Sequence, residues 1–122
     1  MKDNRVTVKK EWDSFRYAFR GLRVLFREEH NAWIHAGATV LVIVGGILCH
    51  LSLTEWALVA FAIGLVFAAE TFNSALERVC DVVQPAQDKR IRDIKDLCAA
   101  AVLLCAIAAA AIGLLVFLPK IF

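Results

Sequence analysis

Apolar residues form three long stretches in this chain, and their lengths predict its main elements. Residues 33–51 and 96–118 are mostly apolar, and each is long enough to cross the ~30 Å hydrocarbon core of a bilayer as a helix. Another apolar stretch begins at Leu53 and continues without a helix breaker into a polar region that ends at Val83. At about 1.5 Å per residue this helix is ~45 Å long, so we expect its end to extend beyond the membrane.

The N-terminal region has an amphipathic pattern instead. Between residues 11 and 28, apolar side chains recur on one helical face and arginines form a stripe beside them. The apolar face contains Trp12, Phe15, Phe19, Leu22 and Phe26, and the stripe contains Arg16, Arg20, Arg23 and Arg27. Such a pattern is typical of a helix that lies in the membrane interface. The alternative is a helix packed on a soluble core, but the rest of the chain offers no such core.

The predicted fold is therefore all-α and integral to a membrane, with three transmembrane helices after an N-terminal amphipathic interfacial helix. We expect a single membrane domain over residues 1–122. Its expected parts are the interfacial helix at 11–28, transmembrane helices at 33–51, 53–83 and 96–118, and a cytoplasmic loop at 84–95. Ser52 and Glu55 fit a capping box at the start of the second transmembrane helix.

Composition and charge agree with this topology and disfavour other classes. The chain is 60% hydrophobic, and Glu55 is the one charged residue between positions 30 and 69. Lys and Arg are concentrated before the first span and between the second and third, which places the N-terminus and that loop in the cytoplasm. The four cysteines lack metal-ligand spacing, and no signal peptide precedes the first span. The basic residues lie where they can contact the anionic headgroups of interfacial lipid. We therefore expect no disulfides and no nucleic-acid binding.

Polar residues line one face of the second predicted span where it leaves the membrane. At about 100° per residue, four of them fall within roughly 80° of each other. They are Glu70, Asn73, Glu77 and Asp81. Carboxylates at the end of an apolar helix are costly, so this stripe is a candidate functional site.

The predicted topology brings Glu29, Lys95 and Asp96 to the same side of the membrane. Several carboxylates together suit Mg²⁺, which commonly takes one or two of them plus substrate phosphates. A lysine can bind a phosphate, and a carboxylate at the apolar boundary can act as a general base on a hydroxyl. Phosphoryl transfer requires a divalent cation, a group that binds the phosphates and a base for the attacking hydroxyl. The residues alone leave open an ion or proton pathway, a structural subunit, or plain helix packing, and no glycine-rich nucleotide motif is present.

The motif around the stripe resembles the small prokaryotic diacylglycerol kinases, a family that includes undecaprenol kinases. Two segments carry this similarity, Glu70-x-x-Asn73-Ser74-Ala75-x-Glu77-x-x-x-Asp81 and Lys95-Asp96-x-x-Ala99-Ala100-Ala101-Val102-Leu103. The resemblance extends from about Ser14 to Leu118 and also includes Gly21-Leu22-Arg23 before Glu29.

The resemblance implies a homotrimer of the bacterial cytoplasmic membrane that transfers the ATP γ-phosphate to a lipid hydroxyl at shared active sites. It implies that Glu70 is the base on that hydroxyl and contacts the lipid together with Asn73. It also implies that Glu29 and Glu77 hold Mg²⁺. The nucleotide side would consist of Tyr17, Asn73, Glu77, Asp81, Lys95 and Asp96.

We expect diacylglycerol as the acceptor, with undecaprenol as the alternative. Both present a primary hydroxyl, so the same base serves either, and an apolar pocket discriminates poorly between lipid tails. Glu29-x-Asn31-x-x-Ile34-His35 resembles the undecaprenol kinase branch, although Trp33 stands where that branch commonly has a basic residue.

Overall fold

The computed structural model describes residues 4–122, with side chains from residue 7 onward, and that part of the chain forms four α-helices and no strands. The helices are α1 (Asn4–Glu28), α2 (His30–Leu48), α3 (Leu53–Val83) and α4 (Lys89–Ile121). Three of them, α2, α3 and α4, are long and apolar enough to cross a membrane. The prediction of an all-α chain with three potential transmembrane helices is confirmed.

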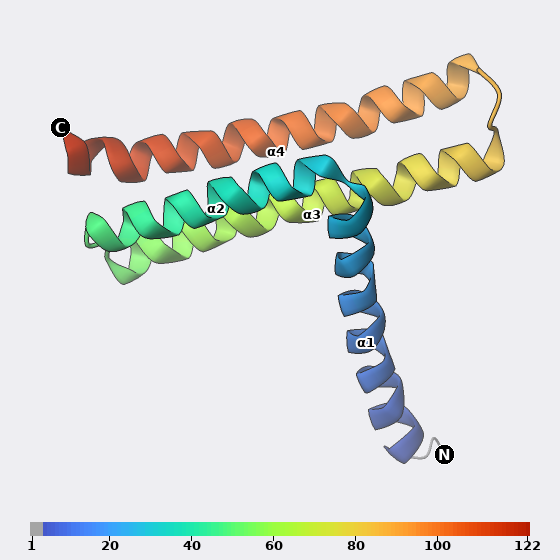
Figure 1. Ribbon diagram of the computed structural model, residues 1–122, viewed down its shortest axis with the longest axis horizontal. Helices are drawn as coiled ribbons and strands as arrows, with labels where there is room; N and C mark the ends of the chain where they lie inside the picture. The colour runs from blue at the N-terminus through green and yellow to red at the C-terminus, as the bar shows by residue number, and fades with distance from the viewer. Residues whose placement is uncertain (1–3) are drawn as a thin grey trace.

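Helices α2, α3 and α4 form a bundle in which consecutive helices run antiparallel (Figure 1). Most contacts between helices join α3 and α4. Helix α1 leaves the start of α2 and points away from the bundle (Figure 1). Since a bundle that crosses a membrane lies along the membrane normal, α1 has the direction expected of a helix in the interface.

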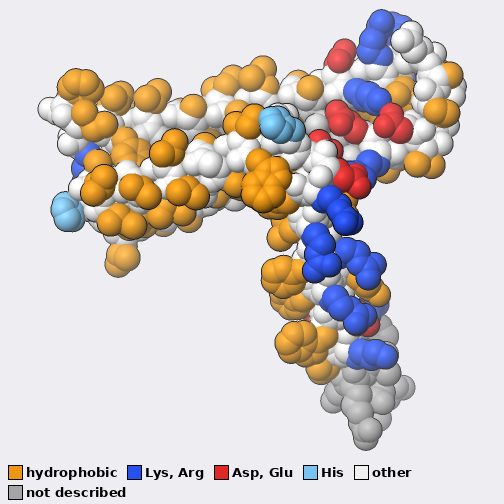
Figure 2. All heavy atoms as spheres, in the orientation of Figure 1, with side chains coloured by type: hydrophobic (Ala, Val, Ile, Leu, Met, Phe, Trp, Pro, Cys, Tyr) orange, Lys and Arg blue, Asp and Glu red, His pale blue; other side chains and the backbone are white. Residues whose placement is uncertain are grey.

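The surface supports this orientation. Trp12, Phe15 and Phe19 on α1 are 72%, 62% and 67% exposed. Figure 2 shows hydrophobic side chains gathered on the side of α1 that faces the apolar end of the bundle, with Lys and Arg side chains on the other side. Exposed apolar faces of this extent mark contact with lipid or with other protein.

Several helix ends differ from the predicted ranges. The loop expected at 84–95 covers only 84–88, and α4 begins at Lys89 rather than at residue 96. The reason is an N-cap: Asp88 Oδ1 accepts a hydrogen bond of 2.8 Å from the backbone N–H of Arg90, which lets a charged segment begin a helix. At the N-terminus, α1 begins at Asn4 rather than residue 11, and α2 begins at His30 directly after the extended residue Glu29.

The turn between α2 and α3 closes with two backbone hydrogen bonds of the Schellman type. Leu51 N–H donates to the carbonyl of Gly46 at 3.2 Å, and His50 N–H donates to that of Ile47 at 3.3 Å. His50 has a φ of 54°, and the buried Leu51 side chain packs with Val59 of α3. The turn thereby fixes how α2 lies against α3.

The predicted capping box is present at the start of α3. Ser52 accepts from the Glu55 backbone N–H at 3.2 Å, and the Glu55 carboxylate accepts from the Ser52 N–H at 2.9 Å. The same carboxylate pairs with Lys120 of α4 at 3.0 Å. The end of the bundle opposite the acidic stripe is therefore tied by one ion pair.

Gly46 allows the close approach of α2 to α3, and its replacement tests the packing. A Cβ at this position would lie 2.5 Å from the Trp56 ring and 3.0 Å from Leu51. We expect Gly46→Ala to destabilise the protein by about 1–3 kcal/mol through overpacking. Gly37→Ala is the control, since a Cβ there meets nothing within 4 Å. Thermal unfolding in detergent micelles measures both, and a Gly46→Ala midpoint at or above that of Gly37→Ala would contradict the packing.

The N-cap of α4 predicts a pH dependence of stability. Hydrogen bonds from the Arg90 side chain, and then from its backbone, lower the pKa of Asp88 from 3.8 to about 2. A depressed folded-state pKa stabilises the fold above the ordinary pKa, and this stabilisation is lost as pH falls toward 2. We expect wild type to unfold at a higher temperature than Asp88→Asn at neutral pH. The difference in unfolding temperature between the two proteins should disappear as pH falls from about 4 to about 2. A difference that stays constant over this range would exclude the charge of Asp88 as its cause.

Candidate active site

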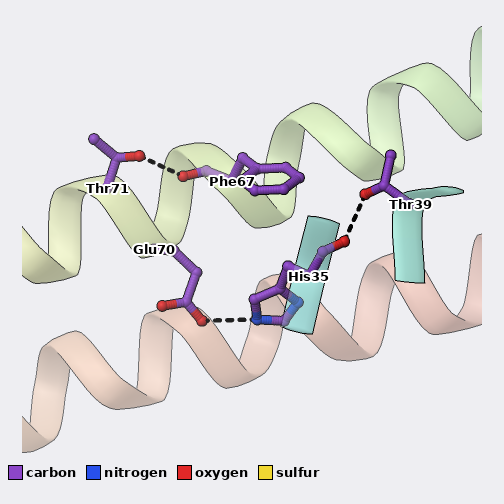
Figure 3. A network of polar contacts seen from close by, with 5 residues as sticks. All are labelled: His35, Thr39, Phe67, Glu70 and Thr71. Atoms are coloured by element: carbon purple, nitrogen blue, oxygen red, sulfur yellow. Dashed lines mark hydrogen bonds and ion pairs between the residues drawn. The ribbon is translucent and has the colours of Figure 1, made fainter. Parts of the chain in front are cut away.

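Glu70 lies at the point on α3 where the apolar residues end, and it faces α2. Its Oε1 lies 3.1 Å from Nε2 of His35, and the two side chains are 13% and 29% exposed. Phe67, one turn earlier on α3, places its ring edge-on to the imidazole with centroids 6.3 Å apart. Figure 3 shows the carboxylate and the imidazole pointing toward each other from adjacent helices. A half-buried carboxylate with one polar partner is a suitable acceptor for a proton.

Glu29 lies at the junction of α1 and α2, in extended conformation, and is tied to α3. Its Oε1 accepts a hydrogen bond of 2.8 Å from the hydroxyl of Ser74, which is 7% exposed. Arg78 donates to Glu28 at 2.5 Å and lies 3.9 Å from Glu29. Ser74 and Glu77 are three residues apart on α3 and share a face, so Glu29 and Glu77 lie on the same side of that helix.

A second polar contact joins the ends of α3 and α4. Lys95 Nζ lies 2.8 Å from Asp81 Oδ1. Both residues line an open cavity of about 610 Å³ next to the 84–88 connection, together with Asp96 and Arg92. Figure 2 shows acidic and basic side chains gathered at this end of the bundle. The cavity offers both cationic and anionic groups to a polar ligand.

The remaining predicted residues lie around these contacts. Asn73 lines a groove between α3 and α4, and its buried Oδ1 has no hydrogen-bond partner among the described residues. Glu77 is half-buried, and it makes no ion pair or hydrogen bond within residues 7–122. Tyr17 is 56% exposed on α1, with the guanidinium carbons of Arg16 and Arg20 at 6.0 and 5.9 Å from its ring centroid.

The predicted residues therefore occupy neighbouring contacts along α3 rather than one closed cluster. Glu70 faces α2, Asn73 and Asp81 face α4, and Glu29 reaches α3 from the α1–α2 junction. No three His, Cys, Asp or Glu side chains in the described part of the chain are grouped to hold a metal. Glu29 and Glu77 still suit a Mg²⁺ ion that also takes phosphate oxygens, since such ions commonly use only one or two carboxylates.

Sequence reasoning missed three partners of the predicted residues, namely His35, Ser74 and Arg78. Ser74 follows Glu70 by four residues and precedes Glu77 by three, so helical spacing places it beside the stripe. His35 is 35 residues from Glu70 in sequence, and no periodicity within one helix could pair them.

An apolar groove of about 200 Å³ is lined by residues of α2, α3 and α4, and His35, the partner of Glu70, is one of them. His35 and Thr39 are its polar lining residues, and the Thr39 hydroxyl donates to the His35 carbonyl at 2.7 Å. The other lining residues are Ala38, Val42, Val59, Ala62, Ile63, Val66, Phe67, Ala109, Ala110, Ile112, Gly113 and Phe117. A groove of this kind, between helices that are apolar enough to cross a membrane, offers a site to an apolar ligand.

Comparison with known proteins identifies the family of this chain. The family model described as prokaryotic diacylglycerol kinase matches residues 16–117, so the chain belongs to this family of membrane lipid kinases. The undecaprenol kinase of Bacillus subtilis is 36% identical over 120 residues, 98% of each chain. The diacylglycerol kinase of Synechocystis is 38% identical over 109 residues, which cover 88% of this chain and 62% of that protein.

These relatives leave the acceptor lipid open between the two alcohols. The relative that matches over its whole length is named for undecaprenol. The expected preference for diacylglycerol is therefore less well supported than the alternative.

Proposed function

We propose that this protein is a polyprenol kinase that transfers the γ-phosphate of ATP to the primary hydroxyl of a lipid such as undecaprenol. The observation that supports this most is the position of Glu70, a largely buried carboxylate whose partner His35 lines an apolar groove. About three turns further along the same helix, Asp81 lines a charged cavity. We infer that the lipid hydroxyl approaches this carboxylate from the membrane and that the nucleotide approaches from the side of the charged cavity.

The groove favours a hydrocarbon alcohol over a glycerol ester. The ester carbonyls of diacylglycerol lose their hydrogen bonds to water on entering an apolar site unless donors replace them. Of the polar groups in this groove, the Thr39 hydroxyl already donates to its own helix and the His35 Nε2 faces Glu70. An isoprenoid chain makes no such demand, and the full-length similarity to an undecaprenol kinase supports the same choice.

The reaction is a direct transfer. Glu70 takes the proton as the lipid O–H bond breaks, and the oxygen forms a bond to the γ-phosphorus. The bond from that phosphorus to the β–γ bridging oxygen breaks, and ADP leaves with its electron pair. The products are lipid phosphate, ADP and a protonated Glu70, which water can later deprotonate.

We assign the nucleotide side to the remaining predicted residues, of which Asp81, Lys95 and Asp96 line the charged cavity. Glu29 and Glu77 would hold Mg²⁺, which supplies neutralising charge to the phosphates when bound. Lys95 offers a cation, oriented by Asp81 at 2.8 Å, and Asp96 lines the same cavity. Asn73 has an unpaired buried oxygen that can accept from a ligand, and Tyr17 offers an exposed ring on α1.

We infer a cytoplasmic-membrane location with the N-terminus in the cytoplasm, and assembly as a homotrimer with shared sites. The charge distribution supports this orientation. An apolar face on the polar half of α3 supports assembly, because five side chains that follow Glu70 are 41–84% exposed. These side chains are Phe72, Leu76, Val79, Val82 and Val83.

Replacement of Glu70 tests the proposal. We expect Glu70→Gln to lower turnover with undecaprenol and Mg·ATP by roughly 10²- to 10⁴-fold, since a general base commonly contributes that much. Glu55→Gln is the control, because it also removes a carboxylate but at the opposite end of the bundle. Radiolabelled phosphate on the lipid, measured in mixed micelles, is the readout. Turnover of folded Glu70→Gln close to that of wild type would show that another group is the base.

A further inference from the structure

We propose that His35 is a positioning residue for Glu70: it donates through Nε2 to Oε1 and so directs Oε2 toward the lipid hydroxyl. This inference rests on the proposed function of Glu70 as the base. The supporting observation is one contact between α2 and α3, in which His35 Nε2 and Glu70 Oε1 lie 3.1 Å apart. Figure 3 shows the dashed contact to one carboxylate oxygen, with the other oxygen pointing away from the imidazole.

The chemistry of the pair fixes the tautomer. An ionised carboxylate can only accept hydrogen bonds, so Nε2 of His35 must carry the hydrogen when Glu70 is ready to act as a base. Oε2 of Glu70 has no hydrogen-bond partner among the described residues, which leaves it available to the substrate. After transfer the new proton lies on Oε2, and the bond from His35 to Oε1 is unchanged.

The neighbouring threonine hydroxyls are not available to Glu70. The hydroxyls of Thr39 and Thr71 donate to backbone carbonyls of their own helices, each at 2.7 Å. Helix α4 contributes only apolar residues to the groove at this point, among them Ala109 and Gly113. His35 is thus the hydrogen-bond donor that fixes the Glu70 rotamer in this part of the site.

The consequence is a change in kcat when the donor is removed. A misplaced catalytic group can lower the rate about 100-fold, so we expect His35→Phe to reduce kcat roughly 10- to 100-fold. The KM values for ATP and lipid should change less than about twofold, because the base, rather than ground-state binding, is disturbed. His35→Gln retains an N–H donor and should keep kcat within about fivefold of wild type.

The experiment compares these variants in mixed micelles with undecaprenol and Mg·ATP. His50→Asn is the matched control, since it replaces a histidine in the α2–α3 turn and tolerates the positive φ there. In a Glu70→Gln background, adding His35→Phe should lower the residual rate by less than about twofold, because the partner is already absent. An unchanged kcat in His35→Phe, a rise in KM alone, or a fully additive double variant would each overturn the positioning role.

A measurement on protein with an intact His35 covers the case in which His35→Phe does not fold. The ¹⁵N NMR resonance of His35 Nε2 should show a bound, slowly exchanging hydrogen that shifts in Glu70→Gln. A resonance that is the same in both proteins would overturn the contact itself. If wild type phosphorylated neither undecaprenol nor diacylglycerol, the proposed function and this inference would both be overturned. If wild type were active and replacement of His35 left kcat unchanged, this inference alone would be overturned.

Discussion

The carboxylate of Glu70 lies where an apolar helix meets polar surroundings, and the site depends on how that carboxylate is held. A charge at this depth is costly unless a polar group faces it. Helix α2 provides that group in His35, and the position of α2 is fixed by the turn at His50 and by the close contact of Gly46 with Trp56. Packing at one end of the bundle thus helps to position His35 against Glu70 near the other end.

A second constraint comes from the length of α3. The helix continues past the apolar bundle and brings Asp81 to the beginning of α4, where Lys95 meets it. About two turns before Asp81, Ser74 holds Glu29 at the junction between α1 and α2. One continuous helix therefore aligns Glu70, the proposed base, with a junction carboxylate and a charged cavity. This alignment suits a reaction in which one reactant comes from the bilayer and the other from water.

Periodicity predicted much of this arrangement because helical spacing and apolar length are local properties. The second span was expected at 53–83, which is where α3 lies, and the capping box at Ser52 is present. The charged loop was predicted too long, since a cluster of charges looks like a loop unless the N-cap at Asp88 is recognised. The pairing of His35 with Glu70 depends on the register between two helices, which no single-helix pattern contains.

We propose that this chain phosphorylates a lipid alcohol and that its apolar groove prefers a polyprenol. The most direct test offers undecaprenol and diacylglycerol to wild type at equal mole fractions in the same micelles, with Mg·ATP labelled in the γ-phosphate. We predict that undecaprenyl phosphate is the main labelled product. Label mainly in phosphatidic acid would contradict the proposed acceptor, and label in neither lipid, from folded protein, would contradict the kinase itself.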